Sequence, residues 1–340
     1  MNILTTLAAF VTALALTFLL SRPTARWQWL DHPNDRSLHQ RPTPRTGGIA
    51  VLVGGLTGGF LLAFFVPATH PLLIALLPGL LPLIAVAWFD DQRGVAVGWR
   101  LTVHVWAALS LALLDLAPRW LRLLGGSWPL PEWVAVILTA LFVVWMINLY
   151  NFMDGMDGFA GGMAVIGFST LAWLGRADTG FSSVCLIVAA ASAGFLVFNF
   201  PPARIFLGDI GSTILGFLAA ACGLWGQREG LFPFWALLLV FSPFIMDATV
   251  TLVRRLLRGE KVWQAHRSHY YQRLVLLGWG HRRTVLAEYA LMLACAGSTL
   301  LAVHWSLAGQ TILVTAWVLV YGLLIRGVSW LEQRRYAPTH

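Results

Sequence analysis

Eleven apolar runs follow one another along this 340-residue chain, and most of them are long enough to cross a lipid bilayer. A transmembrane helix needs about 20 apolar residues to cross the hydrocarbon core. The runs occupy residues 3–20, 47–66, 72–89, 101–117, 133–147, 158–175, 181–198, 212–226, 233–252, 285–304 and 309–327. We therefore predict an all-α, polytopic bundle of about eleven transmembrane helices, formed as a single domain over residues 1–340.

The composition of the chain agrees with a membrane protein. Hydrophobic residues make up 58% and charged residues 11%, whereas soluble domains carry about 25% charged residues. The three cysteines all lie inside apolar runs without the spacing of zinc ligands, which predicts that they are packing residues. The first run has no basic residue before it and no clear cleavage site after it, so we expect a retained span.

Basic residues gather on one side of the predicted membrane. The loops that carry most of the 23 lysines and arginines are 21–46, 90–100, 199–211 and 253–284, together with the C-terminal end. The positive-inside rule makes this side cytoplasmic, with the N-terminus outside. The loop at 148–157 falls on the same side. The net charge of +8 is then a topology signal, and we expect no nucleic-acid partner because no binding module of that kind is present.

Acidic residues are rare, and five of the 15 fall at cytoplasmic ends of predicted spans. Asp90 and Asp91 lie in WFDDQRG, Asp154 and Asp157 in NFMDGMDG, and Asp209 in FNFPPARIFLGDIGS. A carboxylate near membrane depth is costly and is a functional candidate by default. One such aspartate is often an ordinary interfacial residue. Carboxylates that recur in three loops on one face favour a common site.

Neighbouring carboxylates repel one another unless a cation offsets their charge. Few arginines other than Arg93 and Arg204 are available in these loops, so we predict a divalent cation. Oxygen ligands without a Cys/His set favour Mg²⁺, with Mn²⁺ as the alternative, over Zn²⁺. Glycines beside the aspartates, such as Gly158 and Gly208, would let backbone N–H groups approach an anion.

Two basic segments supply the complementary charge: SLHQRPTPRTGG at 37–48 and WQAHRSHYYQRL at 263–274. The HRSH motif of the second segment predicts phosphate contacts, because Arg and His donors accompany the metal in phosphoryl transfer. Pro243 predicts a kink in the ninth span. Asp247, just after it, either reaches the site or pairs with Arg254 or Arg255.

Four motifs occur in a familiar order: FDD, NxxNxxDGxDG, FxGDxGS and a late histidine-containing loop. They resemble, over almost the whole chain, the polyprenyl-phosphate N-acetylhexosamine-1-phosphate transferases of glycosyltransferase family 4, which include MraY, WecA and WbpL-type enzymes. The resemblance implies a Mg²⁺-dependent enzyme of the bacterial inner membrane with its active site facing the cytoplasm. Such an enzyme transfers a sugar 1-phosphate from a UDP-N-acetylhexosamine to undecaprenyl phosphate and releases UMP. Membrane lipids are further implied partners, and the resemblance allows a homodimer.

The resemblance also implies roles for the residues that match the family motifs. Asp90, Asp91 and Asp209 are implied to be catalytic, with Asp91 and Asp209 as metal ligands. The residues implied for the nucleotide sugar are Arg41, Asn151, Asp154, Asp157, Asn199 and Phe206. Those implied for phosphate are His266, Arg267 and His269.

The motifs also bear on the sugar and on competing classes. HRSH differs from the three consecutive histidines of MraY-type enzymes, so we do not expect a MurNAc-pentapeptide substrate. PTPRTGG and HRSHYYQRL look closer to WbpL-type initiators of O-antigen, which favours a 6-deoxy sugar such as FucNAc or QuiNAc; WecA-like transfer of GlcNAc 1-phosphate is the alternative. A proton-coupled transporter would place its acids near the bilayer midplane, and a CDP-alcohol phosphotransferase would keep its aspartates in one short segment.

Overall fold

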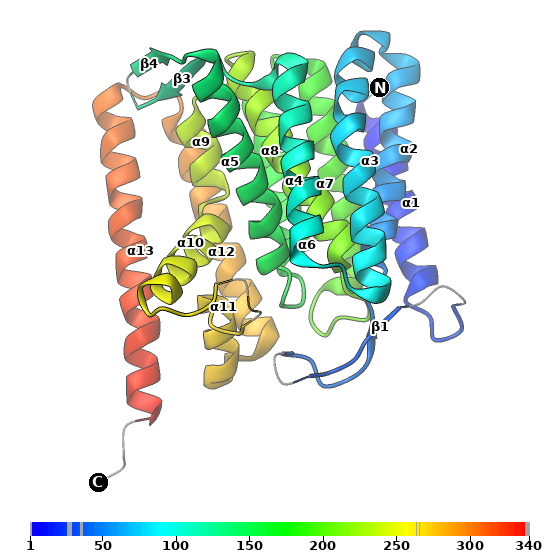
Figure 1. Ribbon diagram of the computed structural model, residues 1–340, viewed down its shortest axis with the longest axis vertical. Helices are drawn as coiled ribbons and strands as arrows, with labels where there is room; N and C mark the ends of the chain where they lie inside the picture. The colour runs from blue at the N-terminus through cyan, green and yellow to red at the C-terminus, as the bar shows by residue number, and fades with distance from the viewer. Residues whose placement is uncertain are drawn as a thin grey trace.

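The computed structural model describes residues 2–25, 29–34, 37–124, 126–262, 264 and 266–336, which form an all-α bundle as predicted (Figure 1). The helices are Asn2–Leu20 (α1), Gly47–Phe65 (α2), His70–Arg93 (α3), Val97–Leu111 (α4), Glu132–Phe152 (α5), Phe159–Leu174 (α6), Thr179–Asn199 (α7), Gly208–Arg228 (α8), Phe234–Val240 (α9), Ser242–Leu257 (α10), Tyr270–Leu274 (α11), Gly280–Ala302 (α12) and Leu307–Tyr336 (α13). Short helical turns at Pro67–Thr69, Ala112–Leu116 and Val275–Trp279 extend α3, α4 and α11.

Two small antiparallel hairpins lie at opposite ends of the bundle (Figure 1). One pairs Leu30–Asp31 (β1) with Thr43–Pro44 (β2), and the other pairs Trp120–Leu123 (β3) with Gly126–Pro129 (β4). The first helix starts at the end of the bundle opposite to the end at which α13 finishes (Figure 1). This arrangement is expected from an odd number of crossings. We refer to the end that holds β1 and the last turn of α13 as the predicted cytoplasmic end.

All eleven apolar runs form helices, in line with the predicted bundle of about eleven transmembrane helices, although they differ in length. Among the described residues, nine helical segments are long and apolar enough to cross a membrane, and a tenth is present if α9 and α10 are taken together. The helix α6 has only 16 residues, fewer than the roughly 20 that a span requires. Most of its side chains are buried among neighbouring helices, so its apolar character reflects packing inside the protein.

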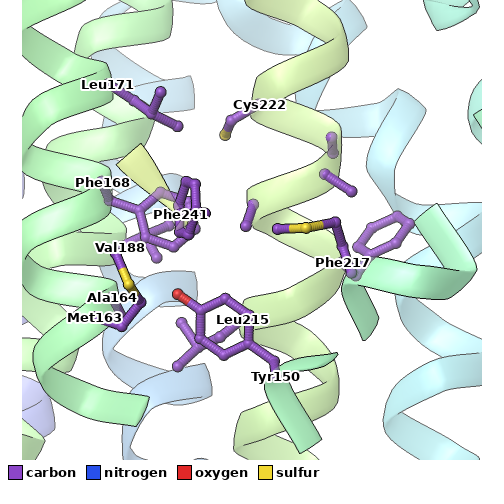
Figure 2. Close-up of a cluster of buried hydrophobic side chains, with 14 of the residues drawn as sticks. Tyr150, Met163, Ala164, Phe168, Leu171, Val188, Leu215, Phe217, Cys222 and Phe241 are labelled. Atoms are coloured by element: carbon purple, nitrogen blue, oxygen red, sulfur yellow. The ribbon is translucent and has the colours of Figure 1, made fainter. Parts of the chain in front are cut away.

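The predicted kink in the ninth apolar run is confirmed, since α9 and α10 meet at an angle of 79°. Pro243 lies in the first turn of α10. A proline is tolerated there because the first N–H groups of a helix need no partner within the helix, but it cannot continue the hydrogen bonding of the preceding helix. Phe241, at the break, points toward Phe168 and Tyr150 in the core (Figure 2). A Cβ atom at Gly167 would lie 2.7 Å from the Phe241 ring. A larger residue at position 167 would therefore clash with Phe241.

Several helix ends differ from the predicted loop boundaries. The helix α3 continues to Arg93, so Asp90 and Asp91 lie in its last turns instead of in a loop. Asp209 lies in the first turn of α8. The predicted loops at 90–100 and 199–211 are therefore shorter than expected, and their aspartates are carried by rigid helix termini.

Candidate active site

A cavity of about 1600 Å³ opens at the predicted cytoplasmic end and continues between the helices. Its polar end is lined by Asp91, Asp154, Asp157 and Asp209, so the structure brings together all three acidic segments. Asn151, Asn199, Phe206, His266 and His269 also line it. The other end is apolar, with side chains from α5, α9 and the β3 strand. One continuous cavity therefore offers both a charged and a hydrocarbon-like environment.

Asp91 organises the start of α8 from its position on α3. Its Oδ1 accepts the backbone N–H of Asp209 at 3.0 Å, and its Oδ2 accepts that of Ile210 at 3.1 Å. The first N–H groups of a helix lack partners within the helix and carry a partial positive charge, which a buried carboxylate satisfies. Gly208 precedes them with φ +75°, a conformation that favours glycine. Asp91 thus fixes where Asp209 lies.

Asp209 is held from a second side by the end of α5. Its Oδ1 accepts a hydrogen bond from Asn151 Nδ2 at 2.5 Å, and the same amide lies 3.3 Å from Ser212 Oγ. Within the described residues, no hydrogen bond reaches the second carboxylate oxygen of Asp209. This oxygen belongs to a side chain that lines the cavity, so Asp209 is both fixed in position and able to bind a ligand.

Asp154 adds a third carboxylate to this region. Burial, together with the charges of Asp209 and Asp91, raises the pKa of Asp154 well above its usual range, and the backbone N–H of Gly208 offsets only part of this. The cluster therefore favours an additional positive charge. No group of three or more His, Cys, Asp or Glu side chains in the described part of the chain forms a complete metal site. The oxygen donors of Asp154 and Asp209 nevertheless fit Mg²⁺, which commonly takes one or two carboxylates and completes its ligands with water and substrate phosphates.

Two arginines lie closer to the aspartates than the sequence predicts, so part of the acidic charge is already offset by the protein. Arg45, from the N-terminal segment, donates to the Asp91 carbonyl oxygen and lies 3.7 Å from its carboxylate. Arg100, in α4, binds Asp90 at 2.8 Å. They were missed because Arg45 approaches from a distant segment and Arg100 folds back from the next helix.

Asp90 is held by contacts within the protein. One carboxylate oxygen accepts the backbone N–H of Val95 at 2.7 Å, and the other accepts from Arg100. Asp90 is not among the residues that line the cavity, whereas Arg100 is. Its location therefore favours a role in orienting Arg100 toward a bound phosphate.

Asp157 and Asn199 tie the loops of the cavity wall to one another. Asp157 lies 3.0 Å from His281 Nδ1. The Asn199 side chain accepts from Gly158 N–H and donates to the Ile205 carbonyl oxygen, both at 2.9 Å. Asp157 and Asn199 were predicted to bind the nucleotide. Because both make contacts within the protein, they more directly shape the cavity wall.

The remaining two predicted nucleotide contacts differ in their placement. Phe206 lines the cavity, and its ring packs edge-on against His39 with centroids 4.9 Å apart. Arg41 is exposed and does not line the cavity, whereas Arg45 does. A basic contact from this segment therefore comes most directly from Arg45.

The histidine loop reaches the cavity with two of its three predicted phosphate ligands. The rings of His266 and His269 lie 4.8 Å apart and both line the cavity, but Arg267 does not. Burial, with added repulsion from His269 and Arg255, lowers the pKa of His266 to about 4. His266 is therefore neutral near pH 7 and can contact phosphate through a hydrogen bond.

Asp247 is a site residue whose role the sequence analysis left open between two alternatives. Asp247 does not line the cavity, and it forms no ion pair with Arg254 or Arg255. Its carboxylate accepts the backbone N–H groups of Tyr270 and Tyr271 at 2.9 and 3.0 Å and lies 3.1 Å from His269 Nδ1. Asp247 therefore holds the start of α11 and orients His269. The bend before α10 brings Asp247 close to His269, and the sequence contains no pattern that predicts this contact.

Comparison with known proteins places this geometry in context. Residues 73–227 match the family described as Glycosyl transferase family 4. This stretch contains all five aspartates of the three acidic segments and ends before the histidine loop.

Similar proteins cover most of the chain. A probable undecaprenyl-phosphate N-acetylglucosaminyl 1-phosphate transferase of Bacillus subtilis is 29% identical over 83% of this chain and 80% of its own length. A decaprenyl-phosphate N-acetylglucosaminephosphotransferase of Mycobacterium leprae is 28% identical over 83% and 78%. An undecaprenyl-phosphate alpha-N-acetylglucosaminyl 1-phosphate transferase of Escherichia coli is 27% identical over 96% and 90%. The predicted family resemblance is confirmed, whereas its narrower WbpL-type form stays a prediction.

Proposed function

We propose that this chain transfers an N-acetylhexosamine 1-phosphate from a UDP-sugar to undecaprenyl phosphate and releases UMP. The match of residues 73–227 to Glycosyl transferase family 4 and the similarity to transferases of this kind support the proposal. The product, a polyprenyl diphosphate sugar, would start a surface polysaccharide such as O-antigen. We place the enzyme in a bacterial inner membrane with its cavity open to the cytoplasm, in line with the distribution of arginines.

The observation that carries this proposal is the two-sided cavity. Its volume of about 1600 Å³ exceeds the roughly 300–1000 Å³ of a typical small-ligand pocket. Leu141, Phe142, Phe234 and Leu238 line the apolar part, which suits a polyprenyl tail. The polar end holds the carboxylate cluster and the two histidines, which suit a nucleotide diphosphate. Both substrates can therefore meet in one site at the membrane surface.

The reaction needs positioning more than proton transfer. An oxygen of the lipid phosphate attacks the sugar-bearing phosphorus of the UDP-sugar, and the bond from that phosphorus to the UMP oxygen breaks. A phosphate monoester is largely ionised near neutral pH, so this nucleophile requires no strong base. The engagement of Asp90 by Arg100 and Val95 agrees with such a mechanism.

We assign the basic side chains of the cavity to the phosphates. Arg45, Arg100 and His269 would bind and orient them, with neutral His266 as a hydrogen-bond donor. Asp209 and Asp154 would hold Mg²⁺, and Asp91 would position Asp209 through the start of α8. When bound, Mg²⁺ would neutralise charge on the transferred phosphoryl group and on the leaving UMP.

The first test uses the purified chain in detergent with undecaprenyl phosphate, Mg²⁺ and a panel of UDP-sugars, with UMP release as the readout. We expect release that stops on addition of EDTA and returns with Mg²⁺. UDP-GlcNAc is the first donor because the relatives are named for N-acetylglucosamine, and UDP-FucNAc and UDP-QuiNAc are the donors of the sequence-based prediction. If no donor yields UMP and the protein does not bind UMP, the transferase proposal is wrong and a transporter is favoured.

Replacement of Asp247 tests the support of the histidine loop. Asp247→Asn puts an amide nitrogen where a carboxylate oxygen accepts an N–H group, so we expect the rate of UMP release to fall about tenfold, as for loss of one to two buried hydrogen bonds. Asp115→Asn, at the opposite end of the bundle, is the control and should keep the full rate. An unchanged rate in Asp247→Asn would show that His269 needs no support from α10.

A further inference from the structure

A second cavity, of about 320 Å³, lies beside the active site at the predicted cytoplasmic end. It is formed by the end of α10, the segment that follows it, α11 and the last turns of α13. Five arginines line it: Arg254, Arg255, Arg258, Arg267 and Arg273. Arginines that only set the orientation of a membrane protein usually lie apart from one another in water. These five instead come from separate elements and line the same cavity.

Two glutamates neutralise only part of this charge. Arg255 is buried and binds Glu260 at 2.7 Å, which lowers the pKa of Glu260 and keeps it ionised. Arg273 pairs with Glu332. With five arginines and two glutamates among the described lining residues, the cavity carries an excess of positive charge that an anion would compensate.

The three other arginines have weak partners. Arg254 donates to the hydroxyl of Tyr270 and lies over its ring, 5.6 Å from the centroid, but forms no ion pair with a described residue. Arg258 lies 4.0 Å from Glu260 at the limit of an ion pair, and Arg267 forms no ion pair with any described residue. Arginine guanidinium groups bind phosphate oxygens well because their N–H groups form a planar fork. The unmatched charge is therefore of the kind that recognises phosphate.

The HRSH motif divides between the two cavities. His266 and His269 line the catalytic cavity, while Arg267 and Ser268 line the second one. The Ser268 hydroxyl also pairs with His266 Nδ1 at 2.8 Å. An anion that binds Arg267 would therefore stabilise the segment that presents the two histidines to the substrate.

The surroundings of the second cavity point to a lipid instead of a soluble anion. Leu276 and Leu277 line it beside the arginines. On α10, Leu256 and Leu257 are 64% and 82% exposed, as expected for side chains that contact lipid. Arginines next to exposed leucines at a helix end lie at headgroup depth, where anionic lipids attract basic residues.

We propose that this arginine cavity binds the phosphate of an anionic membrane phospholipid and that the bound headgroup holds the histidine segment in place. Its volume of about 320 Å³ is at the lower limit of a ligand pocket and suits a headgroup, with the acyl chains outside beside the exposed leucines. The proposal does not depend on the transfer reaction, because binding alone tests it.

The test uses native mass spectrometry to measure the lipid that the full chain retains after purification from nanodiscs that contain phosphatidylglycerol, phosphatidylcholine and undecaprenyl phosphate. Wild-type protein should retain phosphatidylglycerol preferentially. The double variant Arg258→Ala/Arg267→Ala removes two arginines that have little structural role, and each removal should weaken retention about fivefold. The matched control is Arg282→Ala/Arg283→Ala, which removes two exposed arginines near the same end of the bundle that line neither cavity.

Equal loss of phosphatidylglycerol in both double variants would overturn the proposal, because it would reflect general surface charge. Displacement of the lipid by inorganic phosphate would overturn it in favour of a soluble anion. Loss of undecaprenyl phosphate alone, with phosphatidylglycerol still bound, would assign the cavity to the substrate and also overturn it. Loss of phosphatidylglycerol restricted to Arg258→Ala/Arg267→Ala supports it.

Discussion

The Asp209→Asn variant is expected to release UMP about 10³-fold more slowly than the wild type. Removal of one electrostatic contact to a transition state typically lowers a rate by about this factor. The substitution keeps an oxygen that can accept from Asn151 and leaves the backbone N–H to Asp91 untouched. It removes only the negative charge. Because Asp209 repels Asp154, the melting temperature should stay equal or rise slightly.

The control for this loss is Asp178→Asn. Asp178 caps α7 by accepting the Phe181 N–H at 3.0 Å, and asparagine caps helices equally well, so the rate should be unchanged. The rate of each variant is measured against Mg²⁺ concentration. If Asp209→Asn keeps the wild-type rate and Mg²⁺ dependence, Asp209 neither holds the metal nor contacts the reacting phosphates.

The helices could be predicted in order because each apolar run must be buried in lipid or protein. Hydropathy alone does not say which of the two applies: α6 is as apolar as the other helices, yet most of its side chains are buried by neighbouring helices. Helix ends were missed for a different reason. Backbone hydrogen bonding in α3 and α5 continues past the ends of the predicted apolar runs, at 89 and 147, to Arg93 and Phe152.

The location of the acidic cluster could be predicted because alternating crossings bring the three acidic segments to one face. The direction in which each carboxylate points could not. Asp90 is engaged by Arg100 and by the Val95 N–H. Asp91 is held by backbone N–H groups of α8, which lie 118 and 119 residues further along the chain. Such contacts depend on how helices dock, and a single sequence carries no signal for them.

The same docking explains why the glycines of the TGG motif matter. Gly48, in the first turn of α2, donates its N–H to the Leu207 carbonyl oxygen at 2.7 Å, immediately before α8 begins. A Cβ atom at Gly48 would lie 2.6 Å from Gly211 Cα and 2.7 Å from that carbonyl oxygen. Both are backbone atoms that no rotamer change can move aside. The backbones of α2 and α8 therefore touch directly next to Asp209.

Gly48→Ala should consequently lower both stability and activity. Overpacking of this kind costs about 1–3 kcal/mol of unfolding free energy. The start of α8 must shift to relieve it, and a displacement of about 1 Å at a catalytic group can lower a rate about 100-fold. The measurements are the melting temperature in detergent and UMP release at saturating substrate.

Gly55→Ala and Gly59→Ala provide matched controls on the same helix, because a Cβ atom at either position meets nothing within 4 Å. Alanine favours a helix over glycine by about 1 kcal/mol, so these variants should be as stable as the wild type or more so, with full activity. A Gly48→Ala variant that behaved like these two would show that contact between α2 and α8 does not position Asp209. A loss confined to Gly48→Ala would show that the catalytic carboxylate depends on a backbone contact that only glycine permits.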